Sequence, residues 1–463
     1  MSDPNAPADD FDDDFEWDED AAPAASTPTS EDDAVINVSD ASTPVSTGVL
    51  ADGSAAVILA GPGAGTQVTR SPHSENQSEV RLRSRDAALS PGVPLFLVHR
   101  PHQKADLMPR LLAGVVGTTA GAVSAGASAA LPAASDQSIA DWLASCAAAS
   151  VKLADPAAFF KDPTIVRVPP ISPRARTRRP YLLSPLDVAA DLIELQRTVG
   201  ANLFLTAGRA LDPTAPQPSL DAAFAHGDDM LSELRPGERL ALNLTLPATW
   251  LTSSTLRAKL FAQLLDQEQF DVWHIRVQWS SSLRSLTQPV TADLLTGYKR
   301  LAQLAADEGR VLLLPQTGLT GWVQLAFGAH GFGSGLFGSG QAFKEHSQGG
   351  AGGQPEIERY FEPTLLHTVE RAVYDAMRSK PGYVLCDCPY CPALRAKADW
   401  DHTLARLHFM HWQGRLAGVG PATGKTQEAA IRRIVRTAVA AAAAQPLASI
   451  SLPRHLAVWD QLL

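Results

Sequence analysis

Three of the four cysteines of this 463-residue chain lie within six residues, at Cys386, Cys388 and Cys391. A Cys-x-Cys-x-x-Cys turn folds back on itself, so its three thiolates can converge on one metal ion. Pro389 and Pro392 lower the entropy of forming that turn. Thiolates this close together, with imidazoles about twenty residues further on, are typical of a closed tetrahedral zinc site.

The fourth ligand is expected from the segment after the cysteines, which contains three histidines. We expect His411 to complete the site. His408 is the alternative, because it lies one helical turn earlier on nearly the same helix face, and His402 is the weakest candidate. A Cys₃His set leaves no open coordination position, so the expected cofactor is Zn²⁺ with a structural role.

Two other groups of residues could contact a polyanion. A proline-broken arginine run could lie along a phosphate chain or form a solvated linker; it consists of Arg174, Arg176, Arg178 and Arg179. A glycine-rich segment over residues 328–340, which includes Gly331 and Gly333, predicts a functional loop where the backbone approaches a ligand.

Charge is unevenly distributed along the chain. Residues 1–60 contain fifteen Asp or Glu and no Lys or Arg, which leaves 39 basic and 34 acidic side chains in the remainder, a net charge of +5. This mildly basic body is compatible with tRNA or DNA as a partner. The few, clustered cysteines and the lack of a signal-peptide pattern predict a cytoplasmic protein. The charge-free segment 111–134 is mostly small residues, so we expect no membrane span.

Apolar strands and amphipathic helices alternate from Tyr181 onward, which is typical of βα units and a parallel sheet. The expected fold is α/β, a (β/α)₈ TIM-barrel-like domain, with a doubly wound sheet as the alternative. A helix is expected over residues 361–377. The predicted regions are a disordered acidic tail (1–90), an irregular or linker region (91–180), the barrel (181–380), and a zinc-binding subdomain with C-terminal helices (381–463). Within the linker region a strand is expected at residues 94–99 and a short amphipathic helix at residues 139–151.

The Cys-x-Cys-Pro-x-Cys pattern, followed by a histidine in a leucine-rich helix, resembles the zinc site of the tRNA-guanine transglycosylase (queuine/archaeosine tRNA-ribosyltransferase) family. The archaeal-type branch is especially similar. Segment 321–335 resembles the passage of that family from a short helix through a glycine into the final barrel strand. The resemblance spans about residues 181–415 and implies a (β/α)₈ barrel with a zinc subdomain inserted near its end.

The resemblance also implies where a nucleophile should stand. In that family an aspartate on the final strand attacks the ribose carbon, displaces guanine and forms a covalent intermediate that a 7-deazaguanine resolves. Anchored on Gly328 and Phe332, this position falls at Gly333, which has no nucleophilic side chain. The second aspartate of the family, in an Asp-Ser-Gly-Gly-Phe-Gln motif, has no counterpart either. Asp212, just after the strand expected at 202–206, is the candidate replacement.

These observations predict a divergent tRNA-guanine transglycosylase-like protein that acts on nucleic acid. It would either modify a base as a pentosyltransferase or serve as the non-catalytic partner of a catalytic subunit, as inactive zinc-bearing relatives do in that family. The alternative is a non-enzymatic, zinc-stabilised scaffold that binds protein through its acidic tail.

Overall fold

The structure of the protein is a computed structural model. It describes residues 45–49, 55–60, 77–161, 188–280, 288–345, 359–396, 400–422, 424, 426–445, 447 and 452–463.

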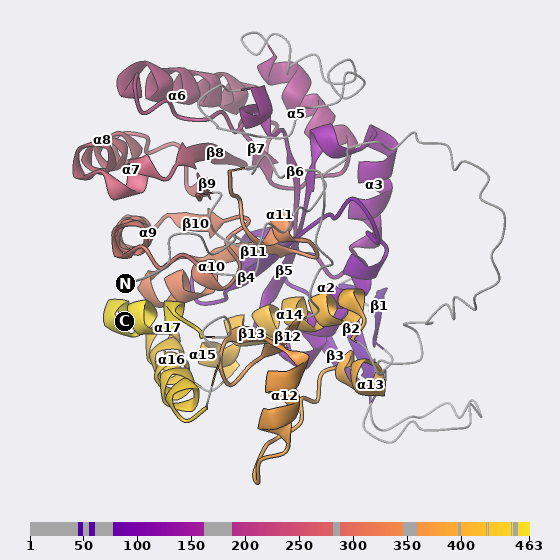
Figure 1. The fold of residues 1–463 in the computed structure, drawn as a ribbon. Coiled ribbons are helices and arrows are strands. Elements are labelled where there is room, and N and C mark those ends of the chain that lie inside the picture. The colour runs from indigo at the N-terminus through magenta and orange to yellow at the C-terminus, as the bar shows by residue number, and fades with distance from the viewer. Residues whose placement is uncertain are drawn as a thin grey trace, which may run out of the picture.

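Eight parallel strands form a nearly closed barrel (Figure 1). Their order around the sheet is β6-β5-β4-β11-β10-β9-β8-β7. The gap between β6 and β7 is bridged by Asn202, whose backbone N–H donates to Lys152 O at 3.0 Å and whose Oδ1 accepts from Lys152 N at 2.7 Å. The strands are β4 (Leu95–His99), β5 (Ser124–Ala130), β6 (Val151–Asp155), β7 (Phe204–Leu205), β8 (Leu240–Pro247), β9 (Val272–Gln278), β10 (Val311–Leu314) and β11 (Gly331–Gly335).

Each barrel strand is followed by a helix, so the predicted (β/α)₈ fold is confirmed. In chain order these are α2 (Leu107–Thr118), α3 (Asp136–Ser145), α5 (Ala189–Thr198), α6 (Pro216–Ser232), α8 (Ser254–Leu265), α9 (Ala292–Asp307), α10 (Gly318–Gln324) and α14 (His402–Ala417). The short helices α7 (Thr249–Thr252) and α11 (Gly338–Gln341) and the 3₁₀ turns η2 (Leu131–Ala133), η3 (Ala158–Lys161) and η5 (Leu325–Phe327) lie in the connections.

Side-chain caps mark where several of these helices begin. Ser135, Ser253 and Asp401 precede α3, α8 and α14, and each side chain accepts a hydrogen bond from a backbone N–H of the first turn. Such caps satisfy donors that have no partner within the helix. Thr426 does the same for α16 (Gln427–Ala443).

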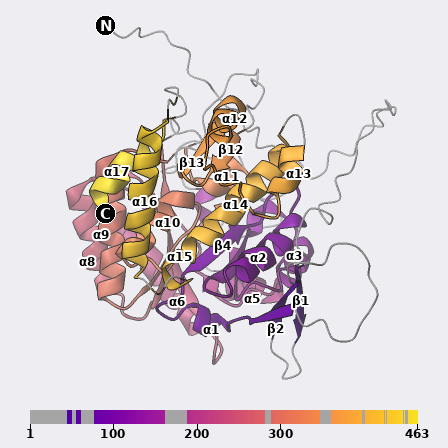
Figure 2. The ribbon, with the colours of Figure 1, turned by 90° about the horizontal axis from the view of Figure 1, so that it is seen from below.

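A small subdomain is inserted between the last strand, β11, and the last barrel helix, α14. It contains the antiparallel hairpin β12 (Arg359–Glu362) and β13 (His367–Glu370), then α12 (Arg371–Arg378) and α13 (Cys391–Ala396). After α14, which packs against α2, α10 and β4, come α15 (Val419–Ala422), α16 and α17 (His455–Leu462), the last packed on α9 (Figure 2).

Two sequence predictions about regions are wrong. Residues 91–180 were expected to be mostly irregular, with one strand at residues 94–99, but they contribute three of the eight barrel strands, the expected one (β4) and also β5 and β6. The interior of β5, Ser-Ala-Gly-Ala-Ser-Ala-Ala, is built from small residues that fill a crowded barrel wall, and their low hydrophobicity hides the strand. The helix expected over 361–377 begins only at Arg371, because the apolar residues before it form the β12–β13 hairpin.

Three short strands and one helical turn lie within the segment that the sequence assigns to the N-terminal tail. Strands β1 (Val45–Val49), β2 (Ala55–Ala60) and β3 (Gln77–Arg81) pair as an antiparallel sheet, with β1 and β2 against α2. Helix α1 (Arg85–Ala88) follows. The remainder of the tail lies outside the described residues.

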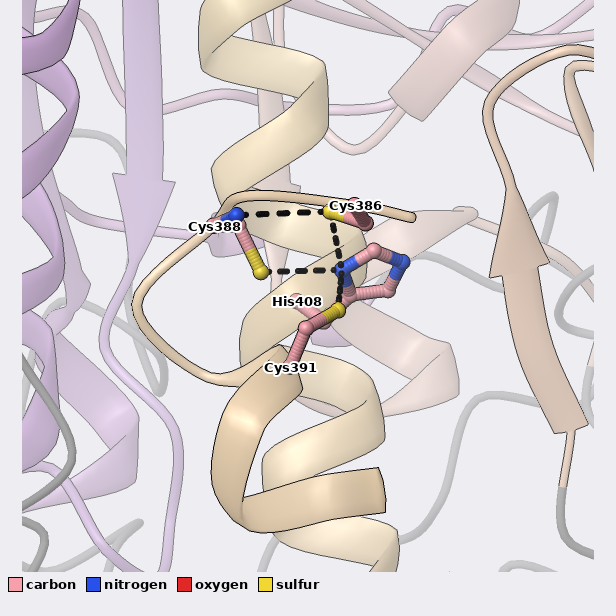
Figure 3. Close-up of side chains that lie close together, drawn as sticks. All are labelled: Cys386, Cys388, Cys391 and His408. Atoms are coloured by element: carbon pink, nitrogen blue, oxygen red, sulfur yellow. Dashed lines mark hydrogen bonds between the residues drawn. The ribbon is translucent and has the colours of Figure 1, made fainter. Parts of the chain in front are cut away.

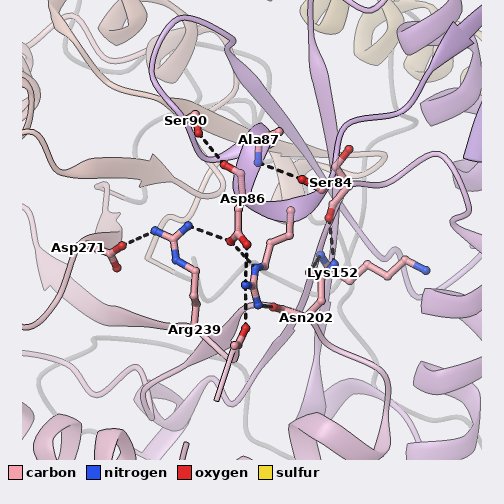
Figure 4. A network of polar contacts seen from close by, with 11 residues as sticks. Ser84, Asp86, Ala87, Ser90, Lys152, Asn202, Arg239 and Asp271 are labelled. Atoms are coloured by element: carbon pink, nitrogen blue, oxygen red, sulfur yellow. Dashed lines mark hydrogen bonds and ion pairs between the residues drawn. The ribbon is translucent and has the colours of Figure 1, made fainter. Parts of the chain in front are cut away.

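The amino-terminal end of the barrel is closed by apolar and ionic contacts. Inside, Leu and Val side chains of the strands pack with Ala88 and Leu89 of the α1 region. Outside them, Asp86 accepts hydrogen bonds from Arg85 and Arg239, and Arg239 also pairs with Asp271 (Figure 4). The contacts at this end stabilise the barrel, since barrel active sites form at the opposite end.

Within the part of the chain that is described, no helix combines the length and apolar composition needed to cross a bilayer.

Candidate metal centre and barrel mouth

Four side chains of the inserted subdomain converge on one point (Figure 3). The three sulfurs of Cys386, Cys388 and Cys391 and the Nδ1 atom of His408 all lie within 4.8 Å of one another. The distances from His408 Nδ1 to the sulfurs are 3.8, 3.2 and 3.3 Å in that order. Ligand atoms around a tetrahedral ion with metal–sulfur bonds of ~2.3 Å and metal–nitrogen bonds of ~2.0 Å stand roughly 3.5 Å apart. The group is therefore able to hold a metal ion.

The local fold explains how the ligands meet. Cys386 and Cys388 lie in the turn after α12, Cys391 opens α13, and His408 projects from α14. The other ring nitrogen of His408, Nε2, donates to the carbonyl oxygen of Phe361 at 2.7 Å, which orients Nδ1 toward the sulfurs.

The imidazole is also held by stacking. The ring of Tyr360 lies on that of His408, with centroids 4.4 Å apart and planes 16° apart. The hairpin that the sequence did not predict thus supplies both contacts that fix this ligand, because Tyr360 and Phe361 are on β12.

The expectation that His411 is the fourth ligand is wrong. Its ring packs edge-on against Tyr390 and is fully buried, and neither nitrogen has a hydrogen-bond partner among the described residues. His408 and His411 are three residues apart and so differ by about 60° in direction around a helix of 3.6 residues per turn. Spacing alone could not separate them. The alternative, His408, is the residue that the structure brings to the cysteines.

A cluster of polar side chains lies at the carboxyl end of the barrel, apart from the metal centre. Along four strands the inward-facing positions change from apolar to polar, so that His99, Asp155, Asn243 and His274 with Arg276 stand above the leucine layers. The carboxyl ends of barrel strands are where such folds place active sites. The sequence carries this signal in the alternation Leu95-x-Leu97-x-His99 and Val151-x-Leu153-x-Asp155, which our interpretation of the strands as uniformly apolar missed.

The carboxylate of Asp155 is the centre of this group. Oδ2 pairs with Arg276, while Oδ1 accepts from Ala157 N at 2.9 Å and Asn243 Nδ2 at 3.1 Å. Burial alone would raise the pKa of Asp155, but Arg276 and the other donors outweigh it and lower the pKa. The carboxylate is therefore ionised and fully engaged, with little nucleophilic character.

Two histidines beside it are neutral. Burial, reinforced by Arg276, lowers the pKa of His274 and of His99 to about 3. The Oδ1 atom of Asn243 accepts from His274 Nδ1 at 2.8 Å, since Asn243 Nδ2 is the donor to Asp155. The Nε2 atom of His274 is then an acceptor, and it has no partner among the described residues.

Aromatic side chains cover the guanidinium of Arg276. Its Cζ lies 4.7 Å from the ring centroid of Phe159 and 5.6 Å from that of Phe343. The two rings meet edge to face at 5.0 Å. Gln316 completes the group, because its Oε1 accepts from Arg276 Nε at 2.6 Å.

Gly333, the position that the resemblance assigns to the nucleophile, lies on the final barrel strand, β11, where the surrounding atoms leave no room for a carboxylate side chain. A Cβ atom on Gly333 would lie 2.5 Å from His99 Nε2 and 3.1 Å from Pro315 Cα. A Cβ on Gly331 would lie 2.7 Å from the carbonyl oxygen of Leu95. The described glycines of this segment therefore allow β11 to pack between β4 and β10, and the predicted ligand-binding loop is a strand.

The other candidates do not join either site. Asp212 lies in the loop after β7, where its Oδ1 accepts from Thr214 N and Thr214 Oγ1 at 2.7 Å each, an ordinary turn that lowers the pKa of its carboxyl group. The arginine run from Arg174 to Arg179 lies outside the described residues.

Neither a protein-family model nor a curated protein sequence matches the chain.

Proposed function

We propose that the ion held by Cys386, Cys388, Cys391 and His408 is Zn²⁺ and that its role is structural. Three thiolates and one imidazole suit zinc, and four protein ligands leave no position for substrate or water. The site joins a turn, α13 and α14, so metal binding would contribute directly to the folding of the inserted subdomain.

We further propose that the chain is a divergent relative of the tRNA-guanine transglycosylases and acts as a non-catalytic partner subunit in the modification of a nucleic-acid base. One observation carries this proposal: a Cys-x-Cys-Pro-x-Cys metal site lies in an insertion between the last strand and the last helix of a (β/α)₈ barrel. This is the arrangement that the sequence resemblance implies.

The barrel mouth supports a non-catalytic role over base exchange. The position for the nucleophile is Gly333, which is too crowded to carry an aspartate. The carboxylate of Asp155 is neutralised by Arg276, which is itself covered by Phe159 and Phe343.

A second candidate function, a protein-interaction scaffold, is favoured by one feature of the metal loop. Val384 and Leu385 stand directly before the first ligand and are 84% and 48% exposed. Apolar side chains held on a metal-stiffened loop could anchor another protein. A partner subunit would use the same surface, so this feature alone does not separate the two functions.

The test is a comparison of modified nucleosides, by mass spectrometry, in tRNA and DNA from cells with and without the gene. We expect loss of a 7-deazaguanine nucleoside and its return on complementation with the intact gene. Unchanged nucleoside profiles would contradict the proposal and favour the scaffold.

A further inference from the structure

The sulfurs of the metal centre also lie near hydrogen-bond donors other than the ligand atoms. The Nε1–H group of Trp412 donates to Cys386 Sγ at 3.1 Å, and the backbone N–H of Cys388 approaches the same sulfur at 3.4 Å. The hydroxyl of Tyr360 lies 3.4 Å from Cys391 Sγ. A metal-bound thiolate can only accept, so with a metal in place Tyr360 would be the donor.

These donors stabilise the net negative charge of the metal site. Three thiolates and a neutral imidazole around a divalent cation leave a net charge of −1 in a site where Cys388, Cys391 and His408 are buried. Burying uncompensated charge is costly. Hydrogen bonds from N–H and O–H groups spread that charge over neighbouring dipoles, and those to charged acceptors are about twice as strong as neutral ones.

The strongest of these donors belongs to a longer chain of contacts. The guanidinium of Arg415 lies over the indole of Trp412, with Cζ 4.4 Å from the ring centroid. Arg415 in turn pairs with Asp387 at 2.6 Å. A cation over the indole face withdraws electron density from the ring and strengthens its N–H as a donor.

The geometry of α14 places the indole of Trp412 next to the metal site. Trp412 is four residues after His408 on α14, so the ligand and the donor stand one turn apart on the same face. Asp387 lies between Cys386 and Cys388, so the contact chain begins and ends within the cysteine turn.

We propose that Trp412 is a positioning residue for the metal. Its indole N–H, strengthened by Arg415, holds the sulfur of Cys386 in the geometry of the site and sets how tightly the ion is bound. This inference rests on the proposed zinc site and is independent of the proposed role in base modification.

The experiment measures zinc affinity of the full-length chain by competition with a chromophoric chelator at pH 7. Removal of an outer hydrogen-bond partner typically costs 10–100-fold in metal affinity. We expect a loss of about 10-fold or more for Trp412→Phe, and a smaller loss in the same direction for Arg415→Gln.

The absorption spectrum of the Co²⁺-substituted protein distinguishes a specific effect on the sulfur of Cys386 from a general destabilisation of the subdomain. In the Co²⁺-substituted protein the sulfur-to-metal charge-transfer band should move to lower energy in Trp412→Phe, because a sulfur lone pair without its hydrogen bond lies higher. Trp279→Phe is the matched control: it removes a buried indole N–H directly after β9, which donates to Tyr298 Oη of α9 at 2.9 Å and lies outside the inserted subdomain. The control should keep the wild-type affinity and band.

The outcomes test the role of Trp412 and the metal assignment separately. Wild-type affinity and band in Trp412→Phe, or an equal loss in Trp279→Phe, would overturn the role of Trp412. A wild-type chain that takes up neither Zn²⁺ nor Co²⁺ would overturn the metal assignment itself.

Discussion

At the scale of the residue, the four cysteines divide into two chemical classes. Cys386, Cys388 and Cys391 converge on His408, whereas Cys146 is a buried thiol at the end of α3, and burial raises its pKa to about 12. The first class is built for a metal ion, and the second is a small apolar side chain that has no ionised form near neutral pH.

This division predicts opposite effects of two cysteine-to-alanine substitutions. Cys388→Ala should lose the metal and lower the melting temperature sharply, because the binding free energy of a structural metal is folding free energy. Cys146→Ala should keep one equivalent of zinc and cost only about 1–2 kcal/mol of unfolding free energy. Elemental analysis and thermal denaturation measure both quantities, and a metal-free but wild-type-stable Cys388→Ala protein would refute the assignment.

The second prediction for single residues concerns the buried ion pair of Arg276 and Asp155 at the barrel mouth. Arg276→Met leaves the buried charge of Asp155 without its partner, which should cost about 3–5 kcal/mol of unfolding free energy. Arg239→Met, at the more exposed pair with Asp271, should cost about 0–1 kcal/mol.

A double substitution separates loss of the pair from loss of packing. Replacing Asp155 by Asn in the Arg276→Met protein removes the orphaned charge and should recover part of the stability in urea denaturation. Additive losses in the double variant would mean that the two groups do not act as a pair.

At the scale of the element, strand β11 shows why glycine occupies the expected nucleophile position. Gly333→Ala should destabilise the protein by about 1–3 kcal/mol, because the new Cβ must displace His99 and the backbone at Pro315. Gly114→Ala is the matched control: it lies within α2, its Cβ would meet only His411 Nδ1 at 3.9 Å, and helix propensity favours alanine by up to about 1 kcal/mol. If Gly333→Ala were as stable as Gly114→Ala, the crowding argument would fail.

Long apolar strands and amphipathic helices could be predicted from the sequence. A strand of small residues and the choice of the histidine ligand could not, because both depend on packing between distant segments. The strand that begins at Val272 and the helix that begins at Ala292 have strong apolar periodicity, so the alternation of strands and helices after Tyr181 was recognisable. Strand β5 was not, because its seven residues are Ser, Ala and Gly. The three cysteines were found from spacing, whereas the choice of His408 depended on the unpredicted hairpin that carries Tyr360 and Phe361.

At the scale of the whole molecule, buried neutral histidines predict the pH dependence of stability. Burial lowers the pKa of His274 and His455 to about 3, and that of His367 to about 4. In the unfolded chain each would have a pKa of about 6.5, so below that pH the unfolded state binds protons that the folded state does not. The contribution of these histidines should be constant above about pH 7, and stability should fall as pH decreases from about 6.5, by up to about 1.4 kcal/mol per pH unit for each histidine.

One substitution checks this slope without disturbing the metal ligands. His455→Gln keeps a group that can donate to the carbonyl oxygen of Leu366 but removes the titration, so its urea-denaturation free energy should depend less steeply on pH between 4 and 6.5. An identical slope in the His455→Gln and wild-type proteins would contradict the assignment.

The barrel and an insertion with a Cys₃His cluster were expected from the resemblance, which began only at Tyr181. Of the three strands before that point only β4 was predicted, from the apolar run at residues 94–99, and β5 and β6 were not. The polar group at the barrel mouth depended on strands from both halves: Asp155 comes from β6, and Arg276 from β9. Residues 121 positions apart are brought together by closure of the sheet, which local pattern cannot reveal.

The most direct test of the proposed role is the binding of the purified, zinc-loaded chain to tRNA as a function of salt. Phosphate contacts require that the logarithm of the association constant fall linearly with the logarithm of the salt concentration. We expect binding at low salt, with a slope corresponding to several phosphate contacts, and no base exchange by the chain alone. Absence of tRNA binding at low salt, or release of labelled guanine by this chain alone, would contradict the account of a non-catalytic nucleic-acid-binding subunit.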